Sequence, residues 1–131
     1  KIYTNRYRDF TPAQGIPVRI TYGYPRWRLP YNIAASAKTV TPGRWFMEGT
    51  DEEFTERYRS MLDSHGVARI RTELETISQL NGSKDIVLLC FDDVSKGLCH
   101  RTIFAQWWQE KTGEEVKELQ KGLEADQNVL F

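Results

Sequence analysis

The apolar run DIVLLCF at residues 85–91 decides the fold class of this chain. Ile86 to Leu89 are all branched aliphatic residues, so the run has no polar face, which is typical of a strand covered on both sides of a sheet. A loop follows, and a helix is predicted from about Cys99 to Lys111 because Thr112-Gly113 supplies a stop signal. A short strand is predicted from Glu115 to Leu119. Strand, helix and strand in this order predict a right-handed crossover in a parallel sheet.

Two more helices are predicted before this unit. Thr50 and Glu53 have the spacing of a capping box and mark the start of the first helix. Gly66 separates it from the second, which Asn81-Gly82 ends. Two runs rich in β-branched and aromatic residues predict further strands. These predicted elements are helices at about 51–64 and 67–80, and strands at 1–4 and 18–22.

Together these elements predict an α/β fold, a small Rossmann-like three-layer domain with a mainly parallel sheet. A chain of 131 residues fits one domain, expected over 1–119, with 120–131 as a C-terminal tail of uncertain structure. No stretch approaches the roughly 18 apolar residues of a membrane span, and no signal sequence is evident. We therefore expect a cytoplasmic protein without a membrane partner, with Cys90 and Cys99 as reduced thiols.

Charge is divided unevenly along the chain, although its formal net charge is zero. Residues 1–46 contain eight basic side chains against Asp9 alone. A basic face of this kind suits an anionic partner, such as a nucleotide, a nucleic acid or an acidic protein surface. The alternative is that these charges are scattered and solvated. The irregular, proline-broken segment 23–49 lies in the same region, and long loops are more often functional than idle.

The strongest candidate site follows the strand at 86–91. In parallel α/β sheets ligands bind beyond the carboxyl ends of the strands, which predicts a crevice containing Cys90, Asp92 and the Cys99-His100-Arg101 triplet. A helix start offers free N–H groups, and an arginine there suits phosphate or carboxylate. A helix start beside a histidine also lowers the pKa of a thiol, so Cys99 is expected to be the more reactive cysteine. The alternative makes Cys90 a small buried hydrophobe and leaves His100 and Arg101 solvated.

A metal site and a cofactor are not expected. Cys90, Cys99, His100 and His65 could supply four ligands, but their spacing matches no zinc knuckle or ribbon, and adjacent ligands on a helix diverge. The segment of this candidate site also lacks the glycine-rich phosphate loop, the serine elbow and the paired carboxylates of common enzyme classes.

The run DIVLLCFDDVSKGLCHRTIFAQWW at residues 85–108 resembles the signature of the family known as domain of unknown function 488. The shared features are an apolar strand ending in Leu-Cys, an acidic residue, and a Cys-His-Arg triplet opening a helix. The segments IYT, PVRITYG with PRW, FTERY and EVKEL agree as well. The resemblance covers Ile2 to about Leu119 and implies a small Rossmann-like fold without an assigned reaction. The matching polar positions are Arg19, Arg26, Tyr58, Cys90, Asp92, Cys99, His100 and Arg101.

These features lead us to expect a protein that binds a nucleotide-like or nucleic-acid substrate, with hydrolysis of that substrate as the candidate reaction. Arg19 and Arg101 would hold an anionic group, with Arg26, Trp27 and Tyr58 also contacting the substrate. His100 or Asp92 would act as acid or base and Cys99 as nucleophile, in a hydrolase of glycosidic or phosphoester bonds. One alternative is a non-catalytic module that binds nucleic acid or a protein. Another is a thiol redox protein, which requires Cys90 and Cys99 to meet.

Overall fold

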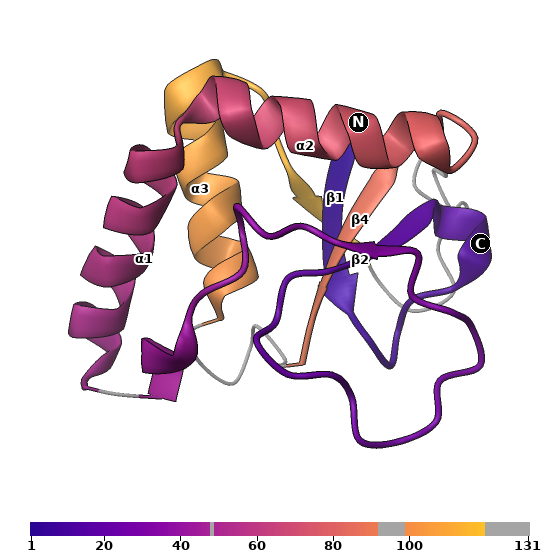
Figure 1. Cartoon of the computed structure of the whole chain (residues 1–131), viewed down its shortest axis with the longest axis horizontal. Coiled ribbons are helices and arrows are strands. Elements are labelled where there is room, and N and C mark those ends of the chain that lie inside the picture. The colour runs from indigo at the N-terminus through magenta and orange to yellow at the C-terminus, as the bar shows by residue number, and fades with distance from the viewer. Residues whose placement is uncertain (48, 92–98, 120–131) are drawn as a thin grey trace, which may run out of the picture.

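A computed structural model describes residues 1–47, 49–91 and 99–119 of the chain. Over these described residues, a five-stranded parallel sheet has the strand order β3-β2-β4-β1-β5, and three α-helices accompany it (Figure 1). The strands are β1 (Ile2–Arg6), β2 (Ile16–Arg19), β3 (Ala35–Ser36), β4 (Ile86–Cys90) and β5 (Lys117–Glu118). The helices are α1 (Asp51–His65), α2 (Val67–Leu80) and α3 (His100–Thr112), with short 3-10 turns η1 (Pro12–Gln14) and η2 (Arg44–Met47).

Strand β4 lies at the centre of the sheet. It pairs in parallel with β1, where Ile2 is opposite Ile86, and with β2, where Ile16 is opposite the same residue. All five of its residues are buried, as its apolar run predicts. The prediction of a central, parallel strand is therefore confirmed.

The three helices pack against one face of the sheet. Ile86 and Leu88 of β4 join a core that includes Tyr58 of α1, Leu74 of α2 and Trp108 of α3. Burial of such large apolar side chains is the main source of stability in a domain of this size. Figure 1 shows α1 and α3 side by side, with α2 crossing near the amino ends of β1 and β4.

Irregular chain covers the opposite face. Val87 and Leu89 point to this side, where they pack with Tyr7 and Phe10 from the segment after β1 and with Tyr31 from the loop after β2. The Tyr31 hydroxyl donates to the Tyr7 carbonyl at 2.6 Å, which fixes the loop to the sheet. Helices, sheet and this irregular layer make a small three-layer α/β domain, as expected.

Most predicted elements occur close to their predicted positions, but the strand predicted at 18–22 is β2 at Ile16–Arg19. The two-residue strand β3 lies in the irregular segment after β2 and was not predicted. Strand β5 pairs with β1, so β1 lies between the two strands that α3 connects. The predicted tail at 120–131 lies outside the described residues. Within the part of the chain that is described, none of the helices has the length and apolar character needed to cross a membrane.

The parallel arrangement brings the C-terminal ends of β1, β2 and β4 to one end of the sheet, called here the carboxyl end. The segments at 7–9, 20–34 and 91 leave the strands there, and α3 begins there. In Figure 1 this end is the lower one. It is the end at which ligands bind in parallel α/β folds.

Candidate functional site at the carboxyl end of the sheet

Cys90, Cys99 and His100 converge at the carboxyl end. Cys90 is the last residue of β4, Cys99 is the N-cap of α3, and His100 is its first helical residue. The sulfurs of Cys90 and Cys99 lie 2.6 Å apart, and His100 Nδ1 lies 3.6 Å from Cys90 Sγ. One potential metal-ligating atom from each of the three residues lies within 4.8 Å of the others. His65 is not part of this group.

The backbone at Cys99 explains why neighbouring side chains can share a site. Cys99 has φ −131° and ψ 141°, which is extended rather than helical backbone. Its side chain therefore does not follow the helical direction of His100, and both can face Cys90. The expectation that Cys99 and His100 diverge rested on placing both inside the helix, and the structure corrects it.

A backbone carbonyl and two aromatic rings orient the His100 ring. Its Nε2 lies 2.6 Å from the Ile20 carbonyl oxygen, which can only accept, so Nε2 carries a proton. Tyr58 and Phe54 meet the ring edge-on, with centroids at 5.5 Å and 6.3 Å. Cys90 Sγ lies beside the ring, 3.6 Å from Nδ1 and 3.9 Å from Nε2, and the imidazole links α3 to the loop after β2.

The two thiols are shielded from solvent, because Cys90 and Cys99 are each only 2% exposed. The contact with Cys90 and burial raise the pKa of Cys99, and the opposing effects of His100 and Arg101 are smaller. The expectation of a lowered pKa and a reactive, accessible Cys99 is therefore wrong. The helix start does lie beside the sulfur, but it does not offset a second sulfur at close contact in a dry site.

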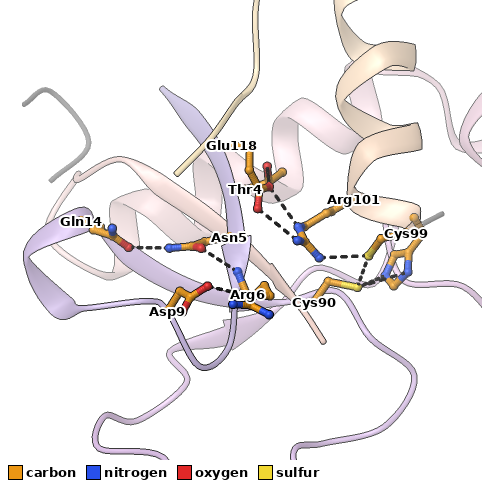
Figure 2. A network of polar contacts seen from close by, with 10 residues as sticks. Thr4, Asn5, Arg6, Asp9, Gln14, Cys90, Cys99, Arg101 and Glu118 are labelled. Carbon is orange, nitrogen blue, oxygen red and sulfur yellow. Dashed lines mark hydrogen bonds and ion pairs between the residues drawn. The ribbon is translucent and has the colours of Figure 1, made fainter. Parts of the chain in front are cut away.

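Arg101 belongs to the interior of the protein and not to a ligand crevice. Its residue exposure is 0%, and its Nε and Nη2 donate to the two carboxylate oxygens of Glu118 at 3.0 Å and 3.1 Å. Its Nη1 donates to Cys99 Sγ at 3.1 Å, and the Thr4 hydroxyl donates to Glu118 at 2.6 Å (Figure 2). These partners occupy the guanidinium, and the role of Arg101 in holding a substrate anion stays a prediction.

Arg19 also has a structural setting. Its Nε donates to the Ser36 hydroxyl at 2.9 Å, and Nη1 donates to the carbonyls of Thr21 and Tyr22. The guanidinium lies 4.0 Å from the centre of the Tyr24 ring. Arg19 therefore supports the start of the loop after β2. A substrate anion bound by Arg19, as predicted, would have to share the guanidinium with these protein acceptors.

Tyr58 lies beneath the site, fully buried, with its hydroxyl donating to the Val40 carbonyl. Burial, with smaller contributions from the two cysteines, raises the pKa of its phenol well above 10. Tyr58 contacts the His100 ring from the interior, and its predicted contact with a substrate stays a prediction. Asp92, the predicted acid or base, lies outside the described residues.

Arg26 and Trp27 are exposed at the carboxyl end, as a substrate-binding role requires. Trp27 is 48% exposed. Three other aromatic side chains in the segments at this end are also exposed: Tyr22 (46%), Tyr24 (63%) and Phe91 (37%). Trp27 and Phe91 meet edge-on with centroids 6.0 Å apart, so the loop after β2 reaches the end of β4. We call this set, with the exposed Arg8, Arg26 and Arg28, the ring–arginine surface.

Sequence reasoning missed three participants in the site. Glu118 and Thr4 hold Arg101, and the Ile20 carbonyl holds His100. A charged residue, Glu118, and a polar one, Thr4, within predicted strands were signals available in the sequence. They did not indicate that Arg101 would be the residue these side chains bind. The exposure of Phe91 was also missed, because it continues the apolar run of β4.

A groove of about 640 Å³ lies at the opposite, amino end of the sheet. Its lining includes Lys1, Arg71, Trp108, Glu114 and Lys117. None of the predicted site residues lines it, and its mixed charges favour no ligand class. The chemistry gathered at the carboxyl end therefore has no connection with this groove.

Comparison of the chain with protein-family models, with curated proteins and with solved structures gave no match. The resemblance to the domain of unknown function 488 family accordingly stays a prediction.

Proposed function

We propose that this protein binds a nucleotide or a single-stranded nucleic acid at the ring–arginine surface. The observation that carries the proposal is that, among the residues that the structure describes, exposed rings and unpaired guanidinium groups both occur in the segments at the carboxyl end of a parallel sheet. Ligands bind at this end in α/β folds, and loops there are free to vary without disturbing the core.

The exposed rings suit nucleobases. Among the described residues, four of the five exposed large hydrophobic side chains are Tyr22, Tyr24, Trp27 and Phe91. A flat ring half in solvent leaves an apolar face on which a base can stack, and stacking contributes about 1–3 kcal/mol per base. The fifth such side chain, Leu80, lies at the end of α2 and offers no ring.

The arginines suit phosphates. Arg8, Arg26 and Arg28 are exposed, and among the described residues none of them forms a hydrogen bond or an ion pair. Arg8 follows β1, and the other two share the loop that carries Trp27. Free guanidinium groups next to stacking rings are the combination with which proteins hold single strands.

Hydrolysis is not part of this proposal. The cysteine expected to act as nucleophile is buried with a raised pKa, and Arg101 is committed to Glu118. A binding role needs neither group.

The test is a fluorescence titration of the protein with a short oligothymidylate and with a mononucleotide at low salt. We expect quenching of tryptophan emission, and we expect Trp27→Ala to weaken oligonucleotide binding by about 1–3 kcal/mol through the loss of one stacked base. Leu80→Ala is the matched control, since it also shortens an exposed apolar side chain but at the far end of α2.

Absence of binding at low salt would refute the proposal, as would an equal loss of affinity in Trp27→Ala and Leu80→Ala. If the protein binds neither the oligothymidylate nor the mononucleotide but does bind a protein partner, the ring–arginine surface is a protein-binding site instead.

A further inference from the structure

We propose that Cys90, Cys99 and His100 form a binding site for one zinc ion. This inference goes beyond nucleotide binding and does not depend on it. Two thiols and one imidazole are a donor set that zinc prefers, and three protein ligands leave the fourth tetrahedral position for a further ligand.

The distance between Cys90 Sγ and His100 Nδ1 is that of two ligands on one zinc ion, although the ring must rotate to aim the Nδ1 lone pair at the ion, because the same sulfur lies only 3.9 Å from Nε2. With Zn–S and Zn–N bonds of about 2.3 Å and 2.05 Å, tetrahedral angles place sulfur and nitrogen about 3.6 Å apart. Cys90 Sγ and His100 Nδ1 lie 3.6 Å apart. Two sulfurs on one zinc ion lie about 3.8 Å apart, so Cys99 Sγ must move away from its 2.6 Å contact with Cys90 by about 1.2 Å.

The groups behind the ligands are those of a metal site. A histidine that binds a metal typically donates its second ring N–H to a carbonyl or carboxylate, which fixes the ligating nitrogen. His100 has such a partner, because Nε2 donates to the Ile20 carbonyl, which leaves Nδ1 as the ligating nitrogen. Arg101 Nη1 donates to Cys99 Sγ at 3.1 Å and can stabilise a metal-bound thiolate in the same way.

Charge balance also favours a divalent ion. Binding as thiolates releases two protons to solvent, and the two negative sulfurs neutralise Zn²⁺. Arg101 and Glu118 neutralise each other beside them. The loaded site is therefore neutral, which a buried position requires. The ion would join the end of β4, the start of α3 and, through His100, the loop that carries Trp27.

The test uses cobalt(II) as a spectroscopic probe for zinc. The full chain is reduced with a phosphine, freed of metal with a chelator, checked for two titratable thiols, and titrated with Co²⁺ without oxygen. We expect thiolate-to-cobalt charge-transfer absorption that saturates at one equivalent and disappears when Zn²⁺ is added. X-ray absorption of the zinc-loaded protein should show two sulfur neighbours at about 2.3 Å.

Variants assign the ligands. Cys90→Ala and Cys99→Ala should each lose charge-transfer intensity, and His100→Ala should weaken zinc binding more than 10-fold, since even second-shell losses cost about 10- to 100-fold. His65→Ala is the matched control and should bind like the wild type. The wild-type spectra need no variant to fold, and circular dichroism checks each variant that is used.

A reduced wild-type protein that gives no charge-transfer band would overturn the proposal and leave the two sulfurs as a dithiol pair open to oxidation. Retention of the full band in Cys99→Ala would overturn it as well.

Discussion

Arg101 shows at the scale of one residue how burial changes the meaning of a motif. An arginine at a helix start is suited to bind an anion, but this one turns inward to Glu118 of β5 and Cys99. The pair holds the first turn of α3 to the far edge of the sheet. Its removal should therefore affect stability before it affects any ligand.

We predict that Arg101→Ala lowers the free energy of unfolding by about 3 kcal/mol, because it leaves a carboxylate without its partner. The value is at the lower end for buried pairs, since the Glu118 side chain is 33% exposed. Urea denaturation measures it. The control is Arg59→Ala, which removes a surface pair with Glu110 and should cost less than about 1 kcal/mol. Similar small losses in both variants would show that Arg101 is not a structural residue.

Tyr58 gives a prediction about pH. Burial raises the pKa of its phenol well above 10, so the folded protein keeps the proton at pH values where the unfolded chain loses it. The stability from this group is complete below about pH 10 and is lost as the pH rises further. Tyr58→Phe should cost about 1 kcal/mol at neutral pH, through the hydrogen bond to Val40, and should make the alkaline loss of stability shallower.

Urea unfolding from about pH 8 to pH 11 measures this slope, to which one phenol contributes up to about 1.4 kcal/mol per pH unit. Tyr24→Phe, which removes an exposed phenol, is the control. An unchanged alkaline slope in Tyr58→Phe would contradict the assignment.

At the scale of the element, helix α1 depends on its first turn. The Glu53 N–H donates to the Thr50 hydroxyl at 3.2 Å, and the Thr50 N–H donates to the Glu53 carboxylate at 2.9 Å. We expect Thr50→Ala to destabilise the protein by about 1 kcal/mol. Ser60→Ala, at an exposed position of the same helix, should change stability by less than about 0.5 kcal/mol. Thermal unfolding compares the two, and equal midpoints would argue against the capping box as a stabilising feature.

Such local signals also explain which elements could be predicted from the sequence. The capping box and the Asn81-Gly82 stop act within one turn of chain, and α1 and α2 occur within one residue of their predicted bounds. The apolar run of β4 predicts its strand in the same way, from residues adjacent in sequence. Strand β3 has only two residues and exists because its neighbour β2 supplies partners, which no pattern inside 35–36 could show.

At the scale of the whole molecule, the grouping of three candidate residues was predictable and their contacts were not. The rule for parallel sheets correctly placed Cys90, Cys99 and His100 together at the carboxyl end. The inward turn of Arg101 depends on Glu118, 17 residues away, and the meeting of the cysteines depends on the extended backbone at Cys99. Tertiary contacts decide both.

The same scale separates two regions at the carboxyl end. The Cys90, Cys99 and His100 group lies inside, and the ring–arginine surface faces solvent. The loop after β2 contributes to both, through the Ile20 carbonyl and through Trp27.

The central claim, that the ring–arginine surface binds single-stranded nucleic acid, is tested most directly by the salt dependence of oligothymidylate affinity. Affinity should fall linearly on logarithmic axes as salt rises, and each phosphate contact contributes about 0.7 to the slope for a single strand. We predict that Arg26→Ala combined with Arg28→Ala reduces the slope by about 1.4 without unfolding the protein. Arg69→Ala, which removes an exposed arginine from α2, should leave it unchanged. A slope unaffected by the double substitution, or lowered as much by Arg69→Ala, would contradict the claim.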